Sequence, residues 1–343
     1  MKAVRLHQYQ ELPRVEEVAE PKATGPWDVI VRIGGAGLCR TDLHIIEGQW
    51  SEKSGVKLPY TLGHENAGWV QEVGSAVSNV AVGDTVIVHP LITCGFCRAC
   101  RAGDDMHCAN QAFPGISVDG GMANFLKTSA RSVVKLDPSL HPKDIAALAD
   151  AGLTAYHAVK KAAAQLYPGT KVVVIGAGGL GHIGVQCLKA LTPAEIIVLD
   201  RSLQALELTS QWGADHRVVA DGSHVEKVRD ITGGQGAEAV IDFVGEAGAQ
   251  QDAVAMLRRA GSHYIIGYGG NLNVPTIDII STEINFIGNL VGNYNDLAEL
   301  MTLTAQGKVK LHTAVYSLDA ALDAIHDLDS GKLRGRGILV PQA

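Results

Sequence analysis

A glycine-rich loop in the middle of the chain most constrains how it can fold. Residues 172–175 form a β-branched apolar run, and the glycine loop 176–181 follows it directly and leads into a helix-type pattern at 180–191. Strand, G-x-G-x-x-G turn and helix in this order are typical of dinucleotide binding, because the glycines let the backbone approach a pyrophosphate that faces the helix N-terminus. The predicted cofactor-binding residues are Gly176, Gly178, Gly179, Leu180 and Gly181.

A carboxylate ends the next predicted strand. Asp200 follows the apolar run 196–199 and lies nineteen residues beyond Gly181. There it would accept hydrogen bonds from the adenosine ribose hydroxyls and repel a 2′-phosphate, which favours NAD over NADP. Arg201 is the next residue and leaves NADP open as an alternative, because an arginine at this place can hold that phosphate.

Two sequence patterns divide the 343 residues. Up to about residue 135, short β-type runs alternate with glycine and proline, which predicts a mostly β domain. An alanine-rich stretch at 142–164 marks the junction, and from 171 the alternation of strands and helices predicts a parallel sheet covered by helices. Two helices, near 295–304 and 318–329, and a strand at 337–340 follow. Periodicity leaves open to which domain this last segment belongs.

Composition excludes several classes of protein. With 46% hydrophobic and 19% charged residues, the chain can bury a large interior, and its length suits two domains. A net charge of −7 without a long basic run argues against nucleic-acid binding. The sequence has no signal-type apolar core and no stretch of about eighteen apolar residues. We therefore expect a soluble, cytoplasmic protein without nucleic-acid or membrane partners.

Four cysteines form a compact cluster, with two, two and seven residues between successive members. Thiolates at such spacing can converge on one zinc ion, and a closed set of four makes the site structural. An iron–sulfur cluster is the alternative, since it also takes four thiolates. The residues are Cys94, Cys97, Cys100 and Cys108. We expect Cys187, in the helix after the glycine loop, to pack in the core.

A second group of chemically active residues comes earlier in the chain. The segment 37–44 carries a thiol, a hydroxyl, a carboxylate and an imidazole, and His64-Glu65 follows it. A catalytic zinc takes three protein ligands and keeps one position for substrate. Cys39 and His64 are the first two ligands predicted.

The segment Gly63-His64-Glu65-Asn66-Ala67-Gly68, followed by Gly74 and Val77, resembles the signature of zinc-containing alcohol dehydrogenases of the medium-chain dehydrogenase/reductase superfamily. The cysteine cluster and the glycine loop follow in that family's order, so the resemblance covers essentially the whole chain. It implies an α/β fold: a GroES-like, mostly β catalytic domain with two zinc sites at 1–149 and 288–343, and a Rossmann NAD-binding domain at 150–287.

The resemblance also implies a role for single residues. Cys39 and His64 match catalytic zinc ligands, and Asp42 matches a carboxylate that orients the ligating imidazole. Glu65 matches an acidic neighbour of the metal, and Thr41 matches a hydroxyl that contacts the substrate oxygen. His44 matches a proton-relay histidine, and Arg336 matches an arginine that reaches the cofactor pyrophosphate.

The third zinc ligand departs from the best-known family members. They carry a cysteine there, whereas residues 149–154 of this chain offer only Asp150. Some bacterial members use an aspartate, which keeps the charge of the ligand set unchanged. We therefore predict Asp150, with Glu65 as the alternative third ligand.

These residues together predict NAD-dependent oxidation of primary or secondary alcohols to aldehydes or ketones, and the reverse reduction. Zinc would stabilise the alkoxide, a hydride would pass to the nicotinamide, and the proton would leave through Thr41, a ribose hydroxyl and His44. The resemblance also implies a homotetramer, in which each subunit would hold two zinc ions and NAD. The segments of Trp50, Phe113 and Tyr294 could line an apolar substrate pocket.

Two other readings of the sequence stay open. A polyol, threonine or formaldehyde dehydrogenase would use the same scaffold. A nucleotide-sensing or zinc-binding module would lack catalysis, although Thr41 and His44 beside Cys39 argue against it.

Overall fold

The computed structural model describes residues 1–341, and the chain divides into two compact units. Unit 1 contains residues 1–153 and the segment from 293 onward, and unit 2 contains residues 154–292. The family resemblance predicts the two junctions at 149/150 and 287/288, a few residues earlier. Among the described residues, no helix is both long enough and apolar enough to span a bilayer.

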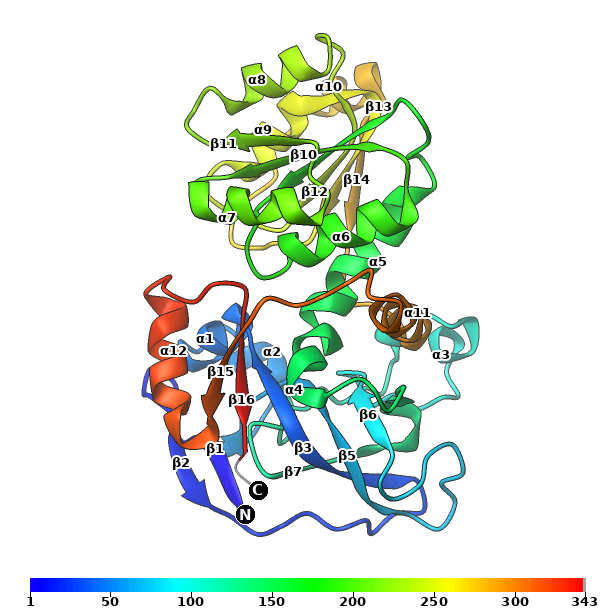
Figure 1. Ribbon diagram of the computed structural model, residues 1–343, viewed down its shortest axis with the longest axis vertical. Coiled ribbons are helices and arrows are strands. Elements are labelled where there is room, and N and C mark those ends of the chain that lie inside the picture. Colours follow the sequence, from blue (N-terminus) through cyan, green and yellow to red (C-terminus); the bar gives the residue numbers. More distant parts are fainter. Residues whose placement is uncertain (342–343) are drawn as a thin grey trace. The chain divides into compact units, whose positions relative to one another are not determined.

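Unit 2 is built on a parallel sheet with six strands in the described residues (Figure 1). Their order across the sheet is β11-β10-β9-β12-β13-β14, in which the chain turns back at β9 as in doubly wound dinucleotide-binding folds. This order confirms the predicted Rossmann-type α/β class. The strands are β9 (Lys171–Ile175), β10 (Glu195–Asp200), β11 (His216–Val219), β12 (Ala237–Asp242), β13 (Leu257–Ile265) and β14 (Asn285–Gly288).

Helices connect these strands, and Figure 1 shows α6 and α7 in front of the sheet. The β-branched residues of β9 are buried, which is what a strand covered on both faces requires. Helix α7 continues into a 3₁₀ turn, Ser210–Trp212. The helices are α5 (Ala151–Ala163), α6 (Gly181–Leu191), α7 (Leu203–Thr209), α8 (His224–Ile231), α9 (Ala249–Met256) and α10 (Thr276–Thr282).

Unit 1 contains the mostly β part of the chain. Its larger sheet runs β15-β16-β3-β5-β6-β8, with β7 also paired to β3, and a smaller sheet runs β2-β1-β4. The strands are β1 (Lys2–Leu6), β2 (Arg14–Glu17), β3 (Asp28–Leu38), β4 (Tyr60–Thr61), β5 (Glu65–Val73), β6 (Thr85–Val88), β7 (Phe125–Ser129), β8 (Val133–Lys135), β15 (Thr313–Ser317) and β16 (Arg336–Val340).

Strand β3 is longer than its apolar run at 29–33 predicts. It continues through Gly35, Ala36 and Gly37 because these residues keep pairing with β5, with irregular register between Ile33 and Gly35. Strands β7 and β15 carry no clear apolar alternation, so the sequence pattern alone does not indicate them. The extension of β3 delivers Cys39 to the end of the sheet.

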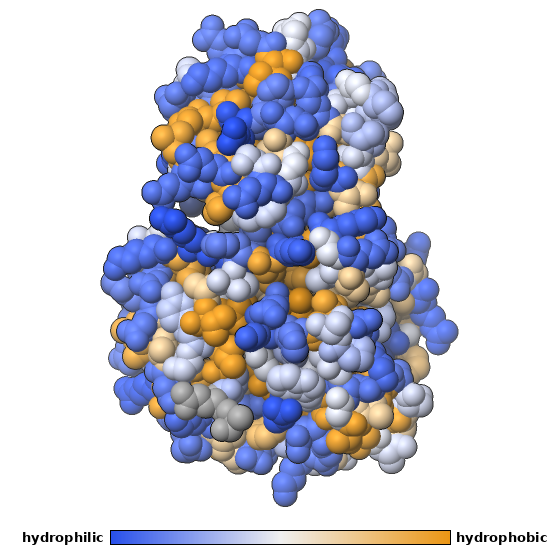
Figure 2. Space-filling view, viewed as in Figure 1, coloured by the Kyte–Doolittle hydropathy of each residue, from blue (hydrophilic) through white to orange (hydrophobic). Residues whose placement is uncertain are grey.

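The C-terminal segment lies in unit 1. Strand β16 pairs antiparallel with β3, Gly337 opposite Leu38, and parallel with β15. The helices of this unit are α1 (Arg40–Ile46), α2 (Ser51–Ser54), α3 (Arg98–Ala102), α4 (Pro142–Ile145), α11 (Tyr294–Ala305) and α12 (Ala321–Asp329). Figure 2 shows mainly hydrophilic side chains on the visible surface of each unit, while the aliphatic clusters lie inside.

Candidate active site and cofactor loop

Four potential metal ligands from three parts of the chain converge in unit 1. One ligand atom of each lies within 4.8 Å of the others, and three of the four residues are buried. They are Cys39, His64, Glu65 and Asp150. The sequence predicts three of them as ligands and Glu65 as the alternative, and the fold brings all four together.

Helix α1 begins at this cluster. Cys39 stands immediately before the helix, and its backbone N–H donates to Oδ2 of Asp42 at 2.8 Å. A carboxylate three residues into a helix satisfies an N–H that would otherwise have no partner. The other oxygen of the same carboxylate, Oδ1, faces Nδ1 of His64 at 3.4 Å. Asp42 therefore fixes the start of the helix and faces the imidazole at the same time.

The imidazole of His64 is 1% exposed and lies between two carboxylates. Its Nε2 faces Oδ2 of Asp150 at 3.5 Å, on the side opposite Asp42. Burial alone would lower the pKa of His64, but Asp42, Asp150 and the Cys39 thiol raise it well above its usual value. Within the described residues neither ring nitrogen has a hydrogen-bond partner of normal geometry. Nε2 is thus available to a metal ion while Nδ1 faces its orienting carboxylate.

The carboxylate of Glu65 is held by protein donors. Its Oε1 accepts from the backbone N–H of Ala151 at 3.0 Å, and its Oε2 accepts from Arg336 at 2.5 Å. Burial opposes the charge on Arg336, but Glu65 and Cys39 raise its pKa. The sequence assigns Arg336 to the cofactor pyrophosphate. The structure places its guanidinium beside Glu65, a contact that sequence reasoning missed because the two residues are 271 positions apart.

A glycine-lined loop packs directly on the backbone beside His64. A Cβ atom on Gly115 would lie 2.5 Å from the carbonyl carbon of Gly63, and one on Gly120 would lie 2.3 Å from its oxygen. Gly121 donates its N–H to the same oxygen at 2.8 Å. The loop carries Phe113, whose ring meets the His64 ring edge to face, with the ring centroids 5.9 Å apart. The close packing of the glycines fixes Phe113 beside the cluster.

The other predicted pocket and relay residues have distinct surroundings. Thr41 and His44 are both partly buried on α1, three positions apart and hence on one side of the helix. Trp50 packs on the unit 1 core. The hydroxyl of Tyr294 donates to the carbonyl of Val133 at 3.2 Å, so it already makes a structural hydrogen bond.

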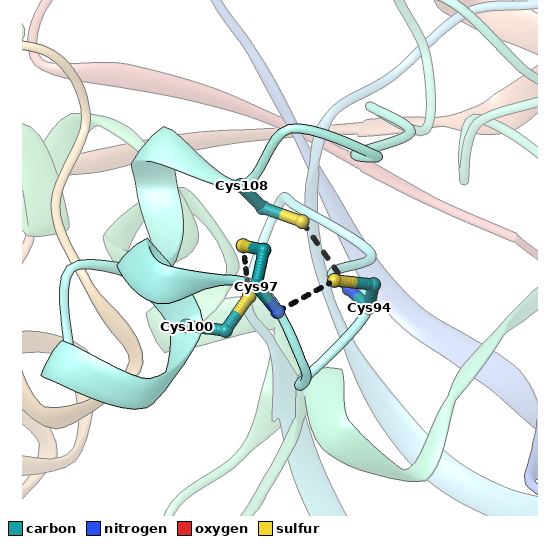
Figure 3. Close-up of side chains that lie close together, drawn as sticks. All are labelled: Cys94, Cys97, Cys100 and Cys108. Carbon is teal, nitrogen blue, oxygen red and sulfur yellow. Dashed lines mark hydrogen bonds between the residues drawn. The ribbon is translucent and has the colours of Figure 1, made fainter.

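The four clustered cysteines form a separate lobe in unit 1, shown in Figure 3. Cys94 comes from the loop after β6, Cys97 and Cys100 come from the start of α3, and Cys108 follows a 3₁₀ turn at Asp105–His107. Their sulfur atoms lie within 4.8 Å of one another, and none is in a disulfide.

Backbone N–H groups point at these sulfur atoms. Cys94 Sγ accepts from Phe96 at 3.5 Å and Cys97 at 3.4 Å, and Cys108 Sγ accepts from Cys94 at 3.3 Å and Asn110 at 3.4 Å. The N–H groups of Cys100 and Ala109 lower the pKa of Cys97 to about 6, whereas burial raises that of Cys100 to about 12. Such donors favour thiolates, the form that binds metal.

Both clusters fit zinc by the chemistry of their donors. Four thiols aimed at one point, with N–H groups stabilising the charge, match a closed tetrahedral site. The cluster around His64 offers sulfur, nitrogen and oxygen, and its free Nε2 points at the other donors. Three such ligands leave a fourth position for another molecule.

The glycine loop of unit 2 has the backbone that its sequence predicts. Gly176 has a φ of +94°, which only glycine adopts readily. A Cβ on Gly181 would lie 1.8 Å from the carbonyl oxygen of Gly176, so this glycine is required for α6 to pack against the turn. Asp200 is anchored at the end of β10: Oδ2 accepts from the N–H of Ala177 at 2.7 Å and Oδ1 from that of Ser202 at 2.8 Å. Arg201 is exposed.

Comparisons with known proteins agree with this architecture. Residues 25–138 match the family model for the alcohol dehydrogenase GroES-like domain, and residues 179–306 match that for zinc-binding dehydrogenase. An NAD-dependent alcohol dehydrogenase of Sulfolobus acidocaldarius is 38% identical over 99% of both chains. The crystal structure of an alcohol dehydrogenase from Aeropyrum pernix superposes with a TM-score of 0.96 at 49% identity, over 99% of this chain and 100% of that one.

A sugar-oxidising protein is also among the relatives. A D-arabinose 1-dehydrogenase (NADP(+)) of Saccharolobus solfataricus is 35% identical over 99% of this chain and 97% of its own length. The fold, the two ligand clusters and the full-length relatives define an oxidoreductase. The chain belongs to the zinc-containing alcohol dehydrogenases of the medium-chain dehydrogenase/reductase superfamily.

Proposed function

We propose that this chain oxidises primary or secondary alcohols to aldehydes or ketones with NAD, and catalyses the reverse reduction. The observation that carries the proposal is the buried cluster in which Nε2 of His64 faces Asp150, close to the Cys39 thiol. The relatives named as NAD-dependent alcohol dehydrogenases support the choice of reaction. Zinc held there would supply a Lewis acid for the substrate oxygen, and NAD would supply the hydride acceptor.

Cys39, His64 and Asp150 would hold the catalytic zinc. Asp150 is preferred to Glu65 because its side chain is 15% exposed and so can meet a metal that substrate must also reach. Both oxygens of Glu65 are already bound by Ala151 and Arg336. Glu65 then acts as a buried negative charge that keeps the Arg336 guanidinium in place. The four-cysteine lobe would hold the second, structural zinc.

The ligand assignment is tested by anomalous scattering at the zinc edge. We expect two peaks per chain in a metal-replete crystal, one at each cluster. A single peak at the four-cysteine lobe would contradict the catalytic assignment. A peak within bonding distance of Glu65 but not of Asp150 would show that the alternative ligand is the correct one.

Asp200 supports NAD as the cofactor. Its carboxylate is fixed by two backbone N–H groups, so it cannot easily turn away from a 2′-phosphate. The neighbouring Arg201 could hold a 2′-phosphate, and one relative is named as NADP(+)-linked. The ratio of activity with NAD to activity with NADP is therefore the quantity to measure. We expect kcat/KM to be higher with NAD than with NADP, and Asp200→Ala to narrow the difference.

Thr41 and His44 would carry the alcohol proton away from the site. They lie on one side of α1, and both are partly accessible. Histidine suits the last step because its usual pKa lies near neutrality. His44→Gln should lower turnover across the neutral pH range, where an imidazole can accept the proton and hydroxide is scarce. An unchanged pH profile of kcat would show that His44 has no such role.

Phe113 favours substrates with an apolar part. Its ring lies against His64, and both Phe113 and Trp50 pack on the unit 1 core. A polyol or sugar dehydrogenase is the second candidate, supported by the D-arabinose relative; threonine and formaldehyde remain in the same test.

The deciding experiment is a panel of primary, secondary, aromatic and sugar alcohols, threonine and formaldehyde, with NAD and with NADP. We expect NADH formation to be strongest with apolar alcohols and to be lost after zinc removal. No signal with any alcohol or carbonyl compound would favour a non-catalytic sensing module. Light scattering tests the proposed homotetramer, and cell fractionation tests the proposed cytoplasmic location. The free thiols are consistent with a reducing compartment.

A further inference from the structure

The sheet of unit 2 buries a carboxylate and an imidazole that the proposed reaction does not use. Asp242, the last residue of β12, and His263, in β13, are each 0% exposed. Oδ2 of Asp242 lies 3.6 Å from Nε2 of His263. In the described part of the chain, neither ring nitrogen nor Oδ2 makes a hydrogen bond. Burying a carboxylate is unfavourable unless it makes compensating contacts, so this aspartate calls for an explanation other than packing.

Asp242 makes its compensating contacts with the loop that follows it. Its Oδ1 accepts from the backbone N–H groups of Val244 and Gly245, each at 2.9 Å. Its backbone carbonyl accepts from Ile266 and Gly267, each at 3.0 Å, at the exit of β13. One residue therefore ties together two loops at the carboxyl edge of the sheet.

The two loops meet backbone to backbone. Gly245 has a φ of +69°, and a Cβ on it would lie 1.9 Å from the carbonyl carbon of Gly267. A Cβ on Gly267 would lie 2.3 Å from that of Val244. Such contacts leave residues 243–245 little freedom to move.

The same short segment supports the glycine loop. A Cβ on Gly176 would lie 2.9 Å from a methyl group of Val244, and one on Gly184 would lie 2.8 Å from the Phe243 ring. The N–H of Phe243 donates to the carbonyl of Ile175, the last residue of β9, at 3.0 Å. Any shift of residues 243–245 therefore reaches the turn between β9 and α6. Ligands of parallel α/β sheets bind at this edge, where the strand order reverses between β9 and β12.

We propose that Asp242, with His263 as its buried partner, is a positioning residue that fixes residues 243–245 beneath the glycine loop and thereby sets dinucleotide affinity. The inference rests on the proposed function only in that unit 2 binds a dinucleotide. Asp242 touches no reacting atom in this arrangement. It acts on cofactor affinity and not on the metal cluster, which lies in unit 1.

The test measures NADH binding to the zinc-replete full chain, with fluorescence as the readout. Asp242→Ala leaves two buried N–H groups without an acceptor, so we expect the NADH Kd to rise about tenfold. Asp242→Asn keeps an acceptor at Oδ1 and should restore most of the affinity. Zinc content and kcat at saturating NAD should stay within about twofold of wild type, because ligand affinity and chemistry are separable.

Asp221→Ala is the matched control. Asp221 also follows a strand of this sheet, and its Oδ1 accepts from the backbone N–H of Ser223 at 3.0 Å. It is exposed and paired with Lys227 on α8. Removing it should leave the NADH Kd unchanged. Should Asp242→Ala fail to fold, Asp242→Ser, whose hydroxyl accepts from one N–H group, replaces it with an expected loss of about threefold.

The outcomes separate the two proposals. A wild-type chain that binds neither NADH nor NADPH overturns the proposed function and this inference with it. A wild-type chain that binds NADH, with a folded Asp242→Ala or Asp242→Ser variant of equal affinity, overturns the inference alone. A fall in kcat at saturating NAD with unchanged Kd also overturns it, since Asp242 would then act on chemistry.

Discussion

The two ligand clusters of unit 1 differ in burial, in composition and in the contacts that the surrounding chain makes with them. In the lobe, four identical side chains come from a segment of fifteen residues, and three of them are only partly buried. In the other cluster, four different side chains, which offer a thiol, an imidazole and two carboxylates, come from segments up to 111 positions apart. Its histidine and Glu65 are at most 1% exposed.

The difference shows in how each cluster is held. Backbone N–H groups of the lobe itself surround its sulfur atoms. Around His64, Asp42 from α1 faces the imidazole, and Arg336 from β16 holds the Glu65 carboxylate. The lobe is therefore held by contacts within its own short segment, whereas the buried cluster is held by residues from distant parts of the chain.

Removing a ligand from the buried cluster should have the largest effect on activity. His64→Ala should lower kcat/KM by at least about 100-fold, because even residues that only orient a ligand change affinity or activity by about 10–100-fold. Thermal unfolding should change much less, since the fold holds this cluster. The measurement combines steady-state kinetics with zinc content. Near-normal turnover with one zinc per chain would contradict the proposed catalytic site.

Removing a ligand from the lobe should chiefly affect stability. Cys97→Ser should lower Tm by roughly 5 °C or more, since about 1 kcal/mol moves Tm by about 2–4 °C in a domain of 150–250 residues. Calorimetry and zinc analysis measure both changes. A Cys97→Ser variant that is folded and retains zinc at the buried cluster, but has lost activity, would contradict the proposed difference between the two clusters. Cys187→Ser, outside both clusters, serves as the control for loss of a thiol.

Asp42→Asn tests the orienting carboxylate. The change keeps the shape and the hydrogen bond to Cys39 but removes the negative charge that faces His64. We expect catalytic-site zinc affinity or kcat to fall by about 10–100-fold. Competition with a chromophoric chelator gives the affinity. Equal loss of zinc from the lobe would indicate general unfolding instead.

The pH dependence of the metal-free protein should be the smallest of these effects. The pKa of His64 is raised by its neighbouring carboxylates. Its protonated form therefore stabilises the metal-free fold fully below its unfolded pKa of about 6.5, and this contribution is lost as pH rises through the higher folded value. Zinc must displace that proton, so its affinity for the buried cluster should rise about tenfold per pH unit below the folded pKa.

A chelator titration of the Cys97→Ser variant isolates this dependence, since the lobe is then impaired. His64→Ala in the same background provides the matched control, because no imidazole remains to titrate. An affinity independent of pH between 6 and 7 would show that the proton on His64 does not compete with the metal.

Local sequence patterns predicted much of the fold. The run Val172–Ile175 followed by the glycine loop predicted a Rossmann-type sheet, and the strand order confirms that class. Strand β3 was underestimated because glycines have low strand propensity, and its pairing with β5 compensates for this. Assigning the segment after residue 288 to the catalytic domain needed the family resemblance, because the hydrophobic periodicity of a strand does not show which sheet the strand joins.

The candidate site was predictable only where its residues are close in sequence or match a signature. Spacing picks out the four cysteines, and the resemblance picks out Cys39, His64 and Asp150. The pairing of Glu65 with Arg336 joins strands at opposite ends of the chain, so no local pattern could reveal it. Asp242 likewise carries no motif, and its role follows only from the backbone groups that converge on its carboxylate.

The glycine packing beside His64 also determines how this protein can be redesigned. Gly63, Gly115 and Gly120 leave no space for a side chain between the loop that carries Phe113 and the backbone next to His64. Insertions or bulkier residues there would displace His64. Phe113 belongs to the same loop but presents its ring at the cluster. Substrate range should therefore be altered by exchanging Phe113 on an unchanged backbone, and loop grafting from relatives should succeed only when these glycines are transferred with it.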